Sequence, residues 1–166
     1  SPSINGFEVQ TAVQVKGDAS EGKGTNVNYD KSSSMIVVKY STGIVSAALG
    51  YDTRDNTADA EATTGLAITV TPLENLSVTA KYETTEDTRD ITGLGARYGY
   101  GAGDVYASYQ NVNPDAAGSN DFNQYAAGVT YNLASNIYVF GEVGEFENAN
   151  SSTTDTQTVV GVYYGF

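Results

Sequence analysis

The sequence contains neither cysteine nor histidine among its 166 residues. Without cysteine there is no disulfide framework and no thiol chemistry. The lack of histidine removes the commonest general base and the commonest ligand of transition metals. We therefore expect a protein that is not an enzyme and that binds no cofactor or metal.

Long apolar runs are missing too, because no segment approaches the roughly 18 apolar residues of a membrane helix. That leaves membrane strands open, since a strand crosses with about 10 residues of which every second one is apolar. Basic residues are few, at 8 against 20 acidic ones, and the net charge is −12. The chain has no basic footprint for nucleic acid. Ser1 opens it without a signal peptide, so we expect a processed terminus or a start within a longer precursor.

What is present is alternation. The 18 glycines and 13 tyrosines accompany many Val and Thr residues, a composition typical of all-β proteins. Residues 76–83 are the clearest example, because apolar Leu76, Val78, Ala80 and Tyr82 alternate with polar residues. The same period of two predicts ten strands, within 7–16, 36–40, 45–51, 66–71, 76–83, 93–100, 104–110, 124–131, 137–143 and 159–166.

The connections between these strands alternate in length. Short ones are expected at 41–43, 72–75, 101–103 and 132–136, and long ones at 17–33, 52–62, 84–90, 111–121 and 147–155. This pattern predicts an antiparallel up-and-down meander, with residues 1–166 as a single domain.

Aromatic residues collect at both ends of the predicted strands. Two such girdles are typical of a transmembrane β-barrel, in which amphipathic rings lie at both membrane interfaces. A soluble β-protein also alternates, and it remains the less favoured alternative. The girdle residues are Tyr40, Tyr98, Tyr100, Tyr131, Tyr164 and Phe166 near the short turns, and Tyr51, Tyr82, Tyr109 and Tyr125 near the long loops.

The polar face of the strands predicts the barrel interior. It is rich in Gly, Ala and Ser, and it carries charges that would be costly in a dry core. Around water these charges would create a field across a pore. The alternative is a narrow barrel plugged by ion pairs, because the number of strands determines the interior width. The predicted pore-lining charges are Lys16, Lys39, Lys81, Arg97, Glu8, Glu83, Asp104 and Glu142.

Other acidic residues collect in the predicted long loops. Such an acidic rim would enrich cations at a pore mouth or bridge divalent cations to anionic lipid, and the alternative for each loop acid is simple solvation. The spacing lacks the glycine and the terminal Glu of an EF-hand, so we expect no dedicated calcium site. The rim residues are Asp52, Asp55, Asp59, Glu61, Glu86, Asp87 and Asp90.

Three segments carry a family resemblance. Residues 1–9, Ser-Pro-Ser-Ile-Asn-Gly-Phe-Glu-Val, resemble a turn and strand of the general-diffusion porins of Gram-negative bacteria. Residues 132–136, Asn-Leu-Ala-Ser-Asn, resemble the penultimate periplasmic turn of that family, and residues 160–166, Val-Gly-Val-Tyr-Tyr-Gly-Phe, resemble its last strand.

The resemblance implies the C-terminal ten strands of a sixteen-stranded, usually trimeric porin in the bacterial outer membrane. The first six strands of that family and its constriction loop have no counterpart here. Expected partners are outer-membrane lipid and lipopolysaccharide, a homotrimer or an N-terminal porin segment, and the barrel assembly machinery. That machinery would read an assembly signal formed by Val162, Tyr164 and Phe166.

The expected function is passive diffusion of small hydrophilic solutes and ions, with a weak preference for cations. Ten strands closed alone would conduct poorly, since about eight strands already give an interior that side chains fill. Two alternatives remain at this point. One is a structural outer-membrane barrel that acts as an adhesin or anchor through its loops, and the other is a soluble or fibrous β-protein.

Overall fold

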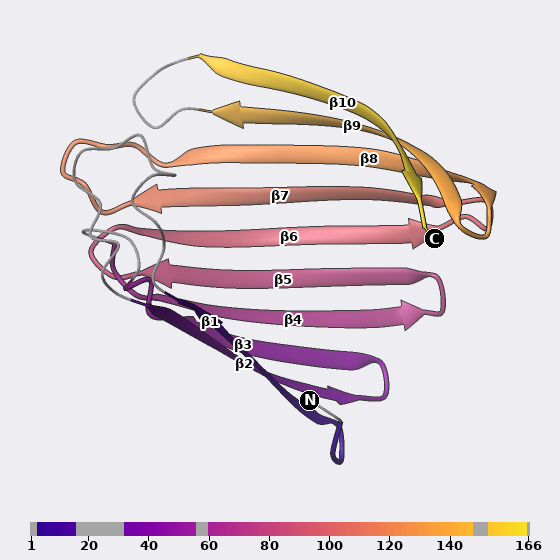
Figure 1. Ribbon diagram of the computed structural model, residues 1–166. Helices are drawn as coiled ribbons and strands as arrows, with labels where there is room; N and C mark the ends of the chain where they lie inside the picture. The colour runs from indigo at the N-terminus through magenta and orange to yellow at the C-terminus, as the bar shows by residue number, and fades with distance from the viewer. Residues whose placement is uncertain (1–2, 16–31, 56–59, 148–152, 166) are drawn as a thin grey trace.

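The computed structural model describes residues 3–15, 32–55, 60–147 and 153–165. They form ten antiparallel strands, each paired with its neighbours in the sequence (Figure 1). The predicted up-and-down meander is confirmed. The strands are β1 (Phe7–Gln14), β2 (Ser33–Thr42), β3 (Val45–Asp52), β4 (Thr63–Leu73), β5 (Leu76–Thr85), β6 (Arg89–Gly99), β7 (Asp104–Pro114), β8 (Phe122–Ala134), β9 (Ile137–Glu147) and β10 (Thr154–Tyr164).

The sheet is curved and open. In Figure 1 the strands follow one another from β1 to β10, and the two ends of the sheet bend out of its central plane. β1 pairs only with β2 and β10 only with β9, so the sheet does not close on itself. Among the residues that the structure describes, no helix is long and apolar enough to cross a membrane.

Tight turns join the strands at one end of the sheet. They lie at 43–44, 74–75, 100–103 and 135–136, close to the predicted positions. The prediction of a long loop at 84–90 was wrong. β5 extends to Thr85 and β6 begins at Arg89, which leaves only a three-residue turn between them. Asp87 takes a positive φ of 51° there, a conformation that Asp tolerates better than most residues.

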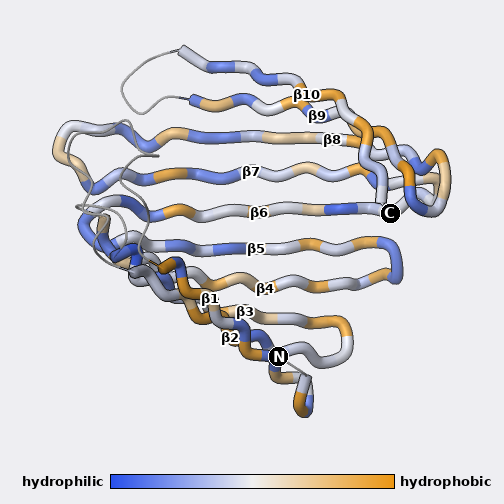
Figure 2. Tube along the Cα trace, in the orientation of Figure 1, coloured by the Kyte–Doolittle hydropathy of each residue, from blue (hydrophilic) through white to orange (hydrophobic). Residues whose placement is uncertain are grey.

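Alternate residues of each strand place the apolar side chains on one face. Figure 2 shows the resulting alternation of hydrophobic and hydrophilic residues along the central strands. Large side chains on this face are open to the surroundings, for example Leu49 at 53% exposed and Leu94 at 58%. A soluble protein would bury such a face, whereas a membrane barrel turns it toward lipid.

The buried side chains lie on the opposite, polar face. Among the described residues only two apolar side chains, Ile91 and Val112, are buried, and buried Ser33, Thr85 and Thr130 share their face. Burial on this side indicates that the polar face is concave and the apolar face convex. The described residues form one sheet and place no apolar core between two layers, which does not support the soluble alternative.

Aromatic side chains of the convex face pack against one another at both ends of the strands. Near the short turns the rings of Phe7 and Tyr40 lie 4.6 Å apart. Near the other end the rings of Tyr109 and Tyr125 lie 5.2 Å apart, and the Tyr109 hydroxyl donates a hydrogen bond of 2.8 Å to Asn123. A ring body against an apolar zone with its hydroxyl on a polar partner is the arrangement expected at a membrane interface.

Candidate functional site

The concave face carries two rows of polar and small residues. Each row consists of the residues that the strand register places opposite one another on successive strands. The central row brings Lys39 and Lys81 to the same level of the sheet, with small residues between them. Lys81 folds across Gly93, where an added Cβ would lie 3.0 Å from its Cγ. The row runs through Glu8, Lys39, Ala48, Ala67, Lys81, Gly93, Gln110 and Gln124.

The second row holds Arg97, Tyr106, Gly128 and Glu142 in that order across β6 to β9. The Tyr106 ring lies over Gly128, where an added Cβ would be 2.5 Å from the ring ζ carbon. Its hydroxyl donates a hydrogen bond to the Glu142 carboxylate on the next strand. The Arg97 guanidinium lies 4.7 Å from the centre of the same ring, within the range of a cation–π interaction.

Asp104 joins this row to the short-turn end. One carboxylate oxygen of Asp104 lies 3.4 Å from an Arg97 nitrogen, and both side chains are partly exposed. The Asp104 backbone N–H donates a 2.8 Å hydrogen bond to the Thr130 hydroxyl. Positive and negative groups therefore stand side by side on a face that water reaches, where ion pairs cost little.

The predicted pore-lining charges that the structure describes all point to the concave face. Lys39, Lys81, Arg97, Glu8, Glu83, Asp104 and Glu142 have this orientation from the strand register. Lys16 lies outside the described residues.

The predicted acidic rim is only partly a loop feature. Asp52 and Asp90 lie within strands β3 and β6, because both strands extend further than the apolar pattern indicated. The Asp52 carboxylate accepts hydrogen bonds from the Ser33 hydroxyl at 2.9 Å and from the Arg54 N–H at 3.0 Å, so it ties neighbouring segments together. Asp55 and Glu61 are in the connection from β3 to β4, and Asp59 is outside the described residues.

The remaining rim residues, Glu86 and Asp87, occupy the turn between β5 and β6. Within the described parts of the chain, no group of three or more acidic side chains could hold a metal ion. These acids therefore contribute negative charge at this end of the sheet without forming a described metal site.

Two residues of the predicted assembly signal lie on the convex face of β10. Val162 is 68% exposed and Tyr164 is 59% exposed, while Phe166 is outside the described residues. Their exposure leaves them accessible on the last strand.

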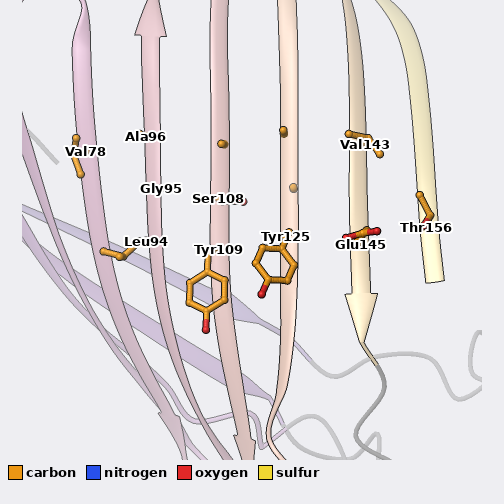
Figure 3. Close-up of a pocket in the computed structure, with 13 residues that line it drawn as sticks. Val78, Leu94, Gly95, Ala96, Ser108, Tyr109, Tyr125, Val143, Glu145 and Thr156 are labelled. Carbon is orange, nitrogen blue, oxygen red and sulfur yellow. The ribbon is translucent and has the colours of Figure 1, made fainter. Parts of the chain in front are cut away.

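The convex face has a shallow hollow of about 620 Å³ over β5 to β10. Figure 3 shows its walls, with the rings of Tyr109 and Tyr125 beside one another and Leu94 and Val143 to either side. Ala96, Ala107 and Ala127 are paired across the sheet at its floor. The lining is apolar except near Glu145 and Thr156, so the hollow suits hydrocarbon and not a hydrated solute.

The sequence pattern did not single out the aromatic residues of the concave face. By register six aromatic residues fall on the polar side of their strands, four of them on β9 and β10: Tyr106, Phe122, Tyr138, Phe140, Phe146 and Tyr163. The sequence signal that could have identified them is a glycine that lies opposite an aromatic residue on the adjacent strand. Only the register reveals which glycine lies beneath which ring.

A family model described as "Gram-negative porin" matches residues 1–151. The chain is 32% identical over 185 aligned positions to a protein named monosaccharide porin from Halomonas sp and to the major outer membrane protein of Halomonas elongata, with 89% of this chain and 50% of each relative covered. The chain thus spans about half the length of the curated relatives it matches.

Solved porins share the fold. A mutant of the Rhodopseudomonas blastica porin matches with a TM-score of 0.72 at 20% identity, covering 99% of this chain and 53% of the porin. The anion-selective porin from Comamonas acidovorans matches with a TM-score of 0.69 at 20% identity, covering 99% and 52%. At such identities the likeness extends to the fold alone.

Proposed function

The chain belongs to the Gram-negative porin family of the bacterial outer membrane, and on that premise we propose that it forms part of the wall of a water-filled pore. Small hydrophilic solutes and ions would cross this pore by passive diffusion. The observation that carries the proposal is the separation of the two faces. Charged groups lie on the concave face, and exposed apolar side chains lie on the convex one. No catalytic role is proposed.

Monosaccharides are the solutes we propose first, because one relative is named for them. A weak preference for cations is proposed from the charges of the concave face. Four basic residues on this face, Lys39, Lys81, Arg89 and Arg97, share it with six acidic ones, Glu8, Asp52, Glu83, Asp104, Glu142 and Asp155. The excess of acidic over basic groups would favour cations in the lumen.

In the described part of the chain β1 and β10 are the outermost strands of an open sheet, which calls for further strands. An open edge in a membrane leaves N–H and C=O groups without partners, and each such group costs several kcal/mol by order of magnitude. We propose that additional porin strands close the barrel and that the finished barrel assembles as a trimer. Barrel assembly factors and lipopolysaccharide are its proposed partners.

Conductance of the complete protein in a planar bilayer tests the proposal. Discrete current steps are expected, and a salt gradient across the bilayer should give a reversal potential of the sign for a cation-leaning pore. Absence of steps from protein that is folded in detergent would contradict the pore. It would then favour a barrel that serves as an anchor through its loops.

Glu142 is expected to contribute to this selectivity. Glu142→Gln keeps an acceptor for the Tyr106 hydroxyl but removes the negative charge, so the cation-to-anion permeability ratio should fall roughly twofold, as for a partly screened charge. Glu145→Gln is the matched control, since Glu145 lies on the same strand but on the convex face. An equal change in both variants would contradict a lumen position for Glu142.

Asp55 and Glu61 are expected to act only at low salt. The double substitution Asp55→Asn and Glu61→Gln should lower single-channel conductance at about 0.01 M salt, where the Debye length is about 30 Å. At about 1 M salt, where it is about 3 Å, conductance should be unchanged. Conductance measured across this range of salt concentrations distinguishes charge enrichment at the mouth from simple solvation, which predicts no change at either salt.

A further inference from the structure

Three aromatic side chains form a ledge on the concave face near the short turns. This aromatic ledge consists of Tyr138 and Phe140 on β9 and Tyr163 on β10. The rings of Tyr138 and Tyr163 are stacked, with centres 4.9 Å apart and planes 19° apart, and the Phe140 ring is 6.3 Å from Tyr138. Phe140 lies over Gly161, which has no Cβ to lift the ring off the sheet.

The ledge presents aromatic surface beside the polar and charged groups of the concave face. Tyr163 is 52% exposed although it points to the concave side. Covering aromatic carbon that faces a water-filled lumen is favourable, so the ledge offers a contact surface to a passing solute. Neighbouring polar groups decide which solute that would be.

A hollow of about 330 Å³ adjoins the two tyrosines of the ledge. Asn132 lines it and is the residue opposite Tyr138 in the register. The Asn132 side chain is exposed and makes no hydrogen bond to another described residue, whereas the Asn136 amide already donates to the Gly165 carbonyl at 3.0 Å. An amide of this kind offers both donors and an acceptor to a ligand.

We propose that the aromatic ledge and Asn132 form a contact site for the ring of a neutral monosaccharide. The inference rests on the proposed pore function and names the wall along which the sugar passes. A pyranose ring has a flat face of C–H groups, which would lie on Tyr163 or Tyr138, and an edge of hydroxyls, which would bond to the Asn132 amide. The hollow is large enough for one such ring.

A hydrated ion finds fewer favourable contacts at the ledge than a sugar ring does. Glu142, two residues from Phe140 on β9, accepts a hydrogen bond from Tyr106, and Asp104 pairs with Arg97. A hydrated ion meets only ring faces and one neutral amide at the ledge. A sugar ring matches both the apolar and the polar part of the lining.

The test compares D-glucose with D-sorbitol, a similar-sized open-chain alcohol without a ring face. The complete protein is placed in liposomes, and swelling rates in the two solutes are measured together with ion conductance in bilayers. The double variant Tyr138→Ala and Tyr163→Ala should lower the glucose-to-sorbitol rate ratio roughly threefold, as for the loss of a modest stacking contact. Tyr163→Phe alone should retain the ratio, because it keeps the ring.

Tyr131→Ala is the matched control, since Tyr131 lies at the same end of the sheet on the convex face and is 51% exposed. It should leave the ratio unchanged, and detergent-resistant folding of every variant is checked by heat-modifiable gel migration. Equal changes for glucose and sorbitol in the double variant would overturn the ledge as a sugar contact and leave the pore intact. Wild-type protein that passes neither solute nor ions would instead overturn the proposed pore function.

Discussion

The substitution Ala107→Arg is expected to destabilise the folded protein in a bilayer by about 2–4 kcal/mol. This is the cost of a basic side chain on the lipid face near the membrane midplane. Ala107 is in the middle of β7 on the convex face, on the floor of the apolar hollow. Its neighbours in the row are Ala96 and Ala127, which offer no partner for a charge. Reversible urea unfolding of the complete protein in lipid vesicles measures this cost.

Ser108→Arg is the matched comparison, because the next residue of the same strand points to the concave face and is exposed. In water the added charge should cost well under 1 kcal/mol, as most exposed substitutions do. It should also lower the cation preference of the pore. Similar losses of stability for the two variants would contradict the assignment of lipid and water to the two faces.

A methyl group at Gly128 is expected to displace Tyr106. The new Cβ would lie 2.5 Å from the Tyr106 ζ carbon, closer than real Cβ atoms approach other heavy atoms. The ring is held in place by its hydrogen bond to Glu142 and by the Arg97 guanidinium, so it cannot move without losing contacts on both sides. We expect Gly128→Ala to lower the free energy of unfolding by about 1–3 kcal/mol, the usual cost of overpacking.

A double-mutant cycle checks the cause. In a Tyr106→Ala background the ring is gone, so Gly128→Ala should cost little, and the coupling energy should be of the order of 1 kcal/mol or more. Gly141→Ala on the adjacent strand is the control, because a Cβ there meets no atom within 4 Å. Additive effects of the two substitutions would show that Tyr106 does not require the glycine.

Most of the fold could be predicted from the period of the side chains. Leu76, Val78, Ala80 and Tyr82 alternate with polar residues in the sequence and do so in β5. The ends of the strands were harder to place. Arg89 and Asp90 look like loop residues because they are charged, yet they pair with Pro114 and Asn113 in β6 and β7. Backbone pairing continues where the apolar alternation has ended, since the ladder needs only N–H and C=O groups.

The sequence by itself determined the membrane face and the charged face, because in a strand each residue's parity decides the side on which it lies. It also placed the charges Lys39, Lys81, Arg97 and Glu142 on one side. Only the tertiary structure decided which residues are neighbours on that side. The row of Arg97, Tyr106, Gly128 and Glu142 and the stacking of Tyr138 on Tyr163 join strands β6 to β10. Their relative register depends on turn geometry and on the bulge at 132–134 between β8 and β9. That register depends on how neighbouring hairpins pair, and the sequence of a single strand does not determine it.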